Sequence, residues 1–236
     1  TGINGLTGAA NALTVLPGDT LNGSPATLGG AGNVTMNVVT PATPVNVGDP
    51  VPVLDPLTGI VSVPANTPAG SYAITYEICQ AASPTNCDQG VATIGVIAAP
   101  IVAVNDTAPA TNGATGNPSV INAFTNDTLN GAPVNIADIT ATVVTPASNP
   151  GVALDPASGV VSVAPGTPAG AYTITYEICE NLNPANCDQA VVTVNVSAGP
   201  IFADDDSVSG VNGLAGAANV LDVLPGDTLN GNPATL

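Results

Sequence analysis

The side chains of this sequence that could bind a ligand or take part in catalysis are almost all acidic. The chain of 236 residues has 17 Asp and Glu residues and no Lys, Arg or His, so its formal net charge is -17. Without side-chain cations a protein cannot neutralise phosphates, and the composition therefore argues against nucleic-acid binding. The chain also has no imidazole for acid–base catalysis near neutral pH and no amine for a Schiff base.

Carboxylates that gather without a counter-ion repel one another. Like charges about 4–6 Å apart shift a carboxylate pKa by about one unit or more. A hard divalent cation removes this repulsion, and Ca²⁺ accepts oxygens from Asp, Asn and backbone carbonyls in a flexible geometry that suits loops. We therefore predict Ca²⁺ where the acids gather. The alternative is a solvated acidic surface that only aids solubility.

The chain is organised as tandem repeats. Residues 54–99 recur with most positions identical at 154–199, and residues 213–236 closely match 5–28. We predict three repeats: 1–99, which lacks an opening strand, 100–199, and 200–236, the N-terminal part of a third. The last segment either belongs to a longer covalent array or is donated to another subunit across an open sheet edge. The lack of an initiator Met and of a signal peptide predicts a mature or excised segment.

Each repeat has the pattern of short β-strands. Gly and Pro are abundant, at 26 and 23 residues, and Val and Thr favour strands over helices. Apolar side chains alternate at Tyr172, Ile174, Tyr176 and Ile178, and a following strand is expected to bury Val191, Val194 and Val196, with an irregularity near Val192. The strands of the second repeat are predicted near 101–108, 118–124, 138–145, 151–155, 159–164, 171–180 and 189–197. The predicted fold is all-β, with tandem antiparallel β-sandwich repeats of immunoglobulin-like type and about 100 residues each.

The four cysteines form two pairs with the same spacing, Cys79 with Cys87 and Cys179 with Cys187. We predict a disulfide within each pair, closing a hairpin loop and stabilising the repeat by about 2–3 kcal/mol. Disulfides indicate an oxidising compartment, so we expect an extracellular or cell-surface location. Reduced buried thiols, a metal site and a redox role are the alternatives.

The expected strand order places most acids at one end of each repeat. If strands run alternately up and down, the loops after the second, fourth and sixth strands lie at the same N-terminal pole, facing the preceding repeat. Besides the predicted ligands, Asp55, Asp138, Asp155 and Glu180 are expected at such poles. The predicted metal ligands are Asn105, Asp106, Asp127, Asp188, Asp204, Asp205, Asp206, Asp227, Asp19 and Asp88.

Several motifs resemble a known class of proteins. The opening Pro-x-x-Ala-x-(Asn/Asp)-Asp-(Thr/Ser) at 100–107 and 200–207, the segment N-D-T-L-N-G, and T-P-A-G-x-Y-x-I-T-Y-E-I-C are similar to tandem cadherin-like and immunoglobulin-like repeats of large bacterial surface adhesins or extracellular fibrils. The resemblance implies an elongated extracellular stalk or fibre, often stiffened by calcium. It implies metal ligands only at Asn105, Asp106, Asp205 and Asp206, because the first repeat lacks the opening motif. Some relatives lock their domains with Lys–Asn isopeptide bonds, a route closed to a chain without Lys.

The sequence thus favours a structural protein over an enzyme. The leading hypothesis is a bacterial surface filament or adhesin stalk, and the alternative is a module that binds glycans or a neighbouring surface. Catalysis is disfavoured because Asp204, Asp205 and Asp206 are adjacent, and adjacent residues of a strand point to opposite faces. The expected partners are copies of the chain or further repeats, and surface glycans. No apolar run approaches the roughly 18–20 residues of a membrane span.

Overall fold

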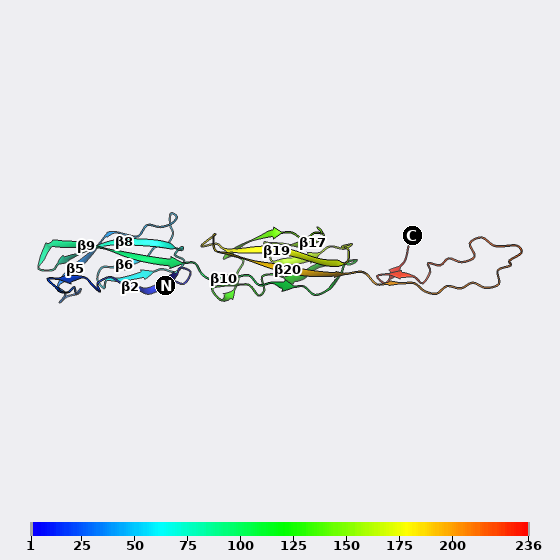
Figure 1. Cartoon of the computed structure of the whole chain (residues 1–236), viewed down its shortest axis with the longest axis horizontal. Helices are drawn as coiled ribbons and strands as arrows, with labels where there is room; N and C mark the ends of the chain where they lie inside the picture. The colour runs from blue at the N-terminus through cyan, green and yellow to red at the C-terminus, as the bar shows by residue number, and fades with distance from the viewer. Residues whose placement is uncertain (1, 236) are drawn as a thin grey trace. The chain divides into compact units, whose positions relative to one another are not determined.

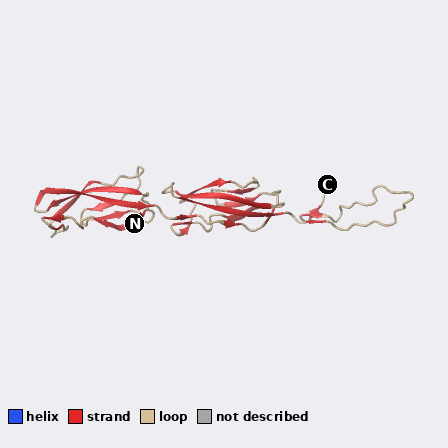
Figure 2. Cartoon of the chain, in the orientation of Figure 1, coloured by secondary structure: helices blue, strands red, loops and turns tan. Residues whose placement is uncertain are grey.

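The computed structural model describes residues 2–235, and all regular structure in this range is β-strand (Figure 2). The prediction of an all-β chain of sandwich repeats is confirmed. Residues 1 and 236, the outermost positions of the first and third predicted repeats, lie outside the described residues. Among the described residues, no helix is long and apolar enough to cross a membrane.

The strands of the first predicted repeat form two larger sheets and a short hairpin (Figure 1). One sheet has the order β1-β9-β8-β5, the second has the order β2-β7-β6, and β3 pairs with β4. The strands are β1 (Ile3–Asn4), β2 (Ala9–Thr14), β3 (Thr20–Leu21), β4 (Ser24–Pro25), β5 (Val34–Thr40), β6 (Val53–Asp55), β7 (Ile60–Val63), β8 (Gly70–Gln80) and β9 (Ser83–Ile97).

The second predicted repeat has the same sheets and additional strands near its start. Its sheets have the orders β11-β20-β19-β16, with β12 also paired to β20, β13-β18-β17, and β10-β14-β15. The strands are β10 (Ile101–Val102), β11 (Asp106–Thr107), β12 (Thr111–Asn112), β13 (Asn117–Asn122), β14 (Thr128–Leu129), β15 (Ala132–Pro133), β16 (Ile139–Thr145), β17 (Val152–Leu154), β18 (Val160–Val163), β19 (Gly170–Glu180) and β20 (Cys187–Ser197).

The remaining strands are β21 (Ile201–Phe202), β22 (Thr228–Leu229) and β23 (Asn232–Pro233), which form one small sheet. Contacts within the chain define two compact units. The first comprises Thr1–Val102, Thr128–Thr140 and Ile178–Asp188, and the second comprises Ala103–Asp127, Ala141–Glu177 and Gln189–Leu236. The repeats themselves are a sequence-based division, and residues 128–140 and 178–188 of the second repeat belong to the first compact unit.

The hydrophobic core of the first repeat lies between its two larger sheets. In the first repeat, Met36, Ile74 and Ile94 from one sheet pack in one cluster with Leu54 and Val61 from the other. Because successive residues of a strand face opposite ways, each strand supplies the core with every second side chain. Burial of these apolar side chains is the main stabilising contribution to such a sandwich.

The predicted alternation in the long hairpin strands is largely confirmed. In β19, Ile174, Tyr176 and Ile178 are buried, and Tyr172 is half-buried. The expected irregularity near Val192 is wrong. The buried residues of β20 alternate regularly and include Val192, whereas Val191 faces outward and is half-buried.

The predicted strand 101–108 is divided in the structure. Ile101 and Val102 pair antiparallel with β14, whereas Asp106 and Thr107 pair parallel with β20. The chain therefore passes from one sheet to another within a few residues, which a continuous strand could not do. The β14–β15 hairpin that receives β10 turns at Asn130-Gly131, where both residues have positive φ angles of 56° and 76°.

Candidate metal centre

The second repeat contains a buried aspartate. Asp127 is 0% exposed. The Tyr176 hydroxyl donates to Asp127 Oδ2 at 2.9 Å, and the Val104 amide donates to Asp127 Oδ1 at 2.8 Å. A buried carboxylate is costly unless such donors replace its water, so Tyr176 stabilises the charge. Tyr176 also packs its ring against Phe124, with ring centroids 5.7 Å apart.

Asp106 is the second carboxylate of this candidate site, near Asp127. Burial, followed by the nearby charge of Asp127, raises the pKa of Asp106 to about 6, although a hydrogen bond with the Asn126 side chain acts in the opposite direction. Its Oδ2 atom is buried and has no hydrogen-bond partner. The structure thus brings two of the predicted ligands, Asp106 and Asp127, close enough to repel each other. An orphaned carboxylate oxygen beside a second carboxylate is a donor set that suits a hard cation.

Asn105 has a structural role in this arrangement. Its Oδ1 accepts a hydrogen bond from the Val191 amide at 2.8 Å, 86 residues away in sequence, which joins the segment before β11 to β20. The prediction that Asn105 is a ligand is not tested by this contact, but one lone-pair direction of its side-chain oxygen is already used.

The first repeat places its aspartates differently. Asp19 Oδ2 accepts a hydrogen bond from the Tyr76 hydroxyl at 3.0 Å, the counterpart of the contact between Tyr176 and Asp127. Burial, and then this carboxylate, raises the pKa of Tyr76 to about 12. Asp88 is exposed in β9 and its Oδ1 accepts from the neighbouring Gln89 amide at 3.0 Å. The structure therefore gives no contact that joins Asp88 to Asp19.

In the third predicted repeat one aspartate contact repeats the pattern of the second. The Asp204 amide donates to Asp227 Oδ1 at 2.7 Å, as the Val104 amide does to Asp127. Asp205 and Asp206 are exposed. Asp188 is half-buried near the start of β20 and has interactions of its own.

Two aspartates expected at the poles close local turns. Asp155 accepts from the Ser158 hydroxyl at 2.6 Å and from the Ala157 amide at 3.0 Å, and these bonds hold its pKa below the ordinary value. Asp55 makes the same turn, and hydrogen bonds from the Leu57 amide and the Thr58 hydroxyl lower its pKa. Both are Asx turns, in which the carboxylate stabilises the chain reversal.

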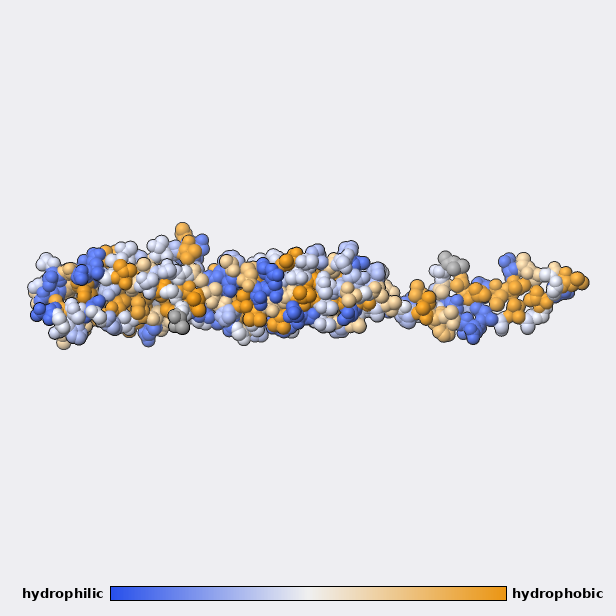
Figure 3. Space-filling view, viewed as in Figure 1, coloured by the Kyte–Doolittle hydropathy of each residue, from blue (hydrophilic) through white to orange (hydrophobic). Residues whose placement is uncertain are grey.

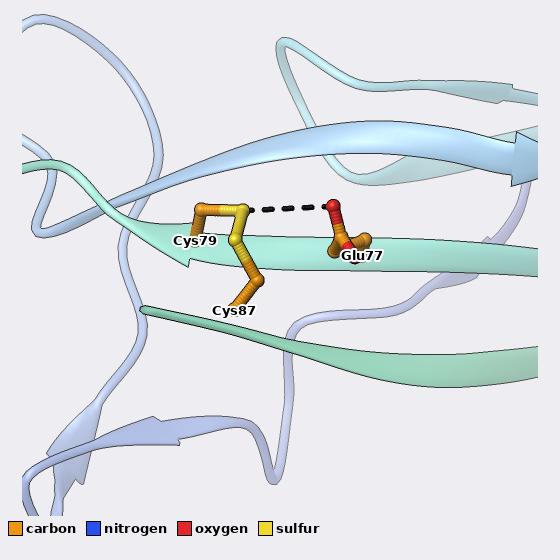
Figure 4. Close-up of side chains that lie close together, drawn as sticks. All are labelled: Glu77, Cys79 and Cys87. Carbon is orange, nitrogen blue, oxygen red and sulfur yellow. Dashed lines mark hydrogen bonds between the residues drawn. A yellow bond between two sulfur atoms is a disulfide. The ribbon is translucent and has the colours of Figure 1, made fainter. Parts of the chain in front are cut away.

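The disulfide prediction is confirmed. Cys79 is bonded to Cys87 with an S–S distance of 2.02 Å, and Cys179 to Cys187 with 2.04 Å. Glu77 Oε2 lies 3.7 Å from Cys79 Sγ on the same face of the hairpin (Figure 4). Although Glu77 and the two sulfurs lie together, a disulfide offers no thiolate, so they do not form a thiolate metal site.

Over residues 2–235, the groups of three acidic or sulfur ligand atoms within 4.8 Å of one another are those with Glu77 and Glu177 beside their disulfides. The predicted metal ligands do not form such a group within this range. The Asp106–Asp127 pair is therefore the best-developed candidate for a metal centre. A cation there would need further oxygens from backbone, Asn side chains or water.

Sequence reasoning missed the part played by Glu180. This residue is 1% exposed, and its Oε2 accepts from the amide groups of Asn183 at 2.9 Å and Asn186 at 2.8 Å. Its Oε1 is buried without a partner. The signal was available, because Glu180 lies two residues after Ile178 and so shares the core-facing side of β19.

The loop between β19 and β20, which contains Asn183 and Asn186, also contacts the first repeat. These contacts lie within the first compact unit. Asn186 Nδ2 donates to the Ala99 carbonyl at 2.7 Å, and Asn183 Oδ1 accepts from the Ala69 amide at 2.7 Å. Asn4 Nδ2 donates to Asn130 Oδ1 at 2.8 Å, and in the second unit Asn112 donates to Asn230 at 2.7 Å. These contacts between successive repeats are made by neutral amides and not by carboxylates.

Among known proteins, the chain is similar only to solved structures, and at low sequence identity. No protein-family model matches the chain, and no curated protein matches it. Among solved structures, it is similar to the human desmocollin-1 ectodomain, with 8% identity, 85% of this chain and 38% of that chain covered, and a TM-score of 0.35. It is also similar to human CDH23 EC21-23, with 14% identity and a TM-score of 0.36. The match covers 86% of this chain and 74% of that chain.

A third similar structure is protocadherin gamma B2 extracellular cadherin domains 3-6, with 11% identity, coverage of 74% of this chain and 46% of that chain, and a TM-score of 0.34. The chain spans less than half the length of this structure and of the desmocollin-1 ectodomain. At these TM-scores the likeness carries no argument about function, which we base on the chain's own residues.

Proposed function

We propose that the chain is a structural repeat protein of a bacterial extracellular filament or adhesin stalk, stiffened by Ca²⁺. The observation that carries this proposal is repetition: the same hairpin, with the same disulfide and the same Tyr–Asp contact, occurs in two successive sandwiches. Repetition of one rigid unit serves length and spacing and needs no catalytic residue.

Disulfides support an extracellular location. Each closes a hairpin at the end of long strands, where it restricts the unfolded chain. A chain with no Lys or Arg also offers trypsin-like proteases no cleavage site, which suits exposed material.

The calcium part of the proposal rests on the Asp106–Asp127 pair. The buried, unpartnered Oδ2 of Asp106 and the raised pKa of this residue both indicate a carboxylate that lacks a positive partner. Ca²⁺ held by Asp106 and Asp127 would supply that charge and join β11 to the residue that precedes β14 within the second compact unit. Asp204, Asp205, Asp206 and Asp227 are proposed as the equivalent site of the third repeat. Of the other predicted ligands, Asn105 and Asp188 are proposed for the second repeat, and Asp19 and Asp88 for the first.

Small-angle X-ray scattering of the full chain tests this function. With EDTA and with millimolar CaCl₂, the proposal predicts a larger maximum dimension and a narrower distribution of shapes when Ca²⁺ is present. Identical scattering curves in the two buffers would contradict the stiffening role. Binding of oligosaccharides on a glycan array, with no effect of Ca²⁺ on the scattering, would favour the glycan-binding module instead.

A further inference from the structure

The long hairpin of each repeat carries the same four side chains on one face. In the ladder between β8 and β9, Glu77 lies opposite Gln89, and Cys79 lies opposite Cys87. Residues two apart on a strand face the same side of the sheet, so these four side chains are neighbours. The second repeat has the same residue types at 177, 189, 179 and 187, although most residues between its two cysteines differ from those of the first repeat.

A carboxylate is fixed beside each disulfide. Gln89 Nε2 donates to Glu77 Oε1 at 3.3 Å, and the other oxygen, Glu77 Oε2, lies 3.7 Å from Cys79 Sγ (Figure 4). In the second repeat, Gln189 Nε2 donates to Glu177 Oε1 at 2.8 Å. In both repeats a carboxylate oxygen and the two sulfurs lie within 4.8 Å of one another. Because the chain has no Lys, Arg or His, no side-chain cation neutralises this negative charge.

The two cysteines of each disulfide differ in exposure. Cys79 is 5% exposed, whereas Cys87 is exposed. Similarly, Cys179 is half-buried and Cys187 is exposed. Figure 3 shows mainly hydrophilic residues around the outer end of the β8–β9 hairpin (left in the view), as expected of a surface that a dissolved thiol can reach. A thiolate from solvent therefore attacks the sulfur of the second cysteine, and the first cysteine is the leaving group.

We propose that Glu77 and Glu177 protect the two disulfides against cleavage by thiols. In this exchange, a solvent thiolate forms a new S–S bond with Cys87 Sγ, the bond between the two cysteines breaks, and its electron pair leaves on Cys79 Sγ. The products are a mixed disulfide at Cys87 and a thiolate at Cys79, so the total charge is unchanged. The negative charge develops on the sulfur beside Glu77, and this repulsion raises the energy of the transition state.

The approach of the attacking thiolate is also opposed. The attacking group is an anion, and besides the Glu77 carboxylate it meets the Pro84 carbonyl oxygen, which lies 3.2 Å from Cys87 Sγ. The Pro184 carbonyl oxygen lies 3.4 Å from Cys187 Sγ in the second repeat. The hairpins should therefore resist negatively charged thiols most and positively charged thiols least, and salt should reduce the difference because it screens the charges.

This protective role goes beyond the proposed structural function and does not depend on calcium. A disulfide restricts the unfolded chain only while it stays oxidised, so a slower exchange prolongs its stabilising effect. Glu77→Gln is the informative change, because Gln has nearly the same shape as Glu and keeps an oxygen that can accept from Gln89, but it has no charge.

The test is the rate at which dithiothreitol reduces each disulfide of the full chain, in EDTA and low salt. Samples taken over time are alkylated and digested with pepsin, and mass spectrometry of the peptides reports the two disulfides separately. Glu77→Gln should speed the reduction of Cys79–Cys87 at least about threefold and leave Cys179–Cys187 unchanged. Glu177→Gln should have the opposite selectivity, so the second disulfide of each variant is an internal control.

Asp222→Asn is the control for net charge. Asp222 is exposed, and its Oδ1 accepts from the Leu224 amide, which the Asn side chain can also do, so neither rate should change. With the anionic thiol 2-mercaptoethanesulfonate the effect of Glu77→Gln should be larger than with dithiothreitol, and with the cationic thiol cysteamine it should be smaller.

Three results would overturn the proposal. Unchanged rates in Glu77→Gln would show that the carboxylate does not affect the exchange. An equal increase at both disulfides would show that the variant acts through the stability of the whole chain. Rates that do not rise with thiol concentration would show that unfolding, and not attack on the folded hairpin, limits the reduction.

Discussion

Replacing Asp106 by Asn should stabilise the calcium-free protein at neutral pH. Asp106 has its pKa raised from 3.8 to about 6 in the folded state. A shift of about two units corresponds to roughly 3 kcal/mol, and because Asp106 is only half-buried, solvent screening reduces this to about 1 kcal/mol. Asn has the same shape and no charge, so it avoids this cost.

The sign of the pH dependence follows from the direction of the shift. Between pH 3.8 and about 6 the folded state binds more protons than the unfolded state at Asp106, so the wild type loses stability as the pH rises through this window. The advantage of Asp106→Asn should therefore be about 1 kcal/mol at pH 7, or about 4 °C in Tm, and should vanish near pH 3.5. In Ca²⁺ the wild type should be the more stable of the two proteins. The ion stabilises the wild type through Asp106, and the variant lacks this ligand.

Thermal unfolding followed by circular dichroism measures both effects, in EDTA from pH 3.5 to 8 and in millimolar CaCl₂ at pH 7. Asp138→Asn is the matched control, since Asp138 is exposed, and its midpoint should change little. If Asp106→Asn has the same midpoint as the wild type, or a lower one, at pH 7 in EDTA, the reasoning about an unpartnered carboxylate is refuted.

Three further outcomes are expected. Tyr176→Phe leaves the buried Asp127 carboxylate with one donor fewer and should lower the free energy of unfolding by about 1–3 kcal/mol in chemical denaturation. Replacing Cys179 and Cys187 together by Ser should lower it by about 2–3 kcal/mol in the same assay, and an unchanged midpoint would show that the hairpin is held by its ladder alone. Asp155→Asn should flatten the loss of stability below pH 4, because the lowered pKa of Asp155 contributes stability above the unfolded pKa of 3.8 that is lost as the pH falls; an acid limb like that of the wild type would contradict this.

Much of the fold could be predicted from repetition and alternation. The period of two residues in Tyr172, Ile174 and Tyr176 defines the core face of β19, and the equal Cys spacing predicts both disulfides. The division of the first strand into β10 and β11 could not be predicted, because it depends on which distant strand each half meets. Hydrogen bonds from Asn130 to Pro100 and from Val191 to Asn105 fix the two halves in different sheets.

The candidate site was less predictable than the fold. The up-and-down parity predicts only that acids gather at one end of each repeat, and it does not predict their burial or their hydrogen-bond donors. Asp127 is buried and accepts from the Tyr176 hydroxyl, and Asp106 lies in β11, which pairs with β20. Glu180 shares the inward face of β19, yet only the amides of Asn183 and Asn186, which come from the following loop, show how its charge is accommodated.

Isothermal titration calorimetry of CaCl₂ into the EDTA-stripped, dialysed full chain measures whether the protein binds Ca²⁺ through Asp106. We expect saturable binding with a Kd between about 10⁻⁶ and 10⁻³ M, weakened at least about tenfold by Asp106→Asn. Heats no larger than those of dilution at millimolar Ca²⁺, or a binding curve that Asp106→Asn leaves unchanged, would contradict it.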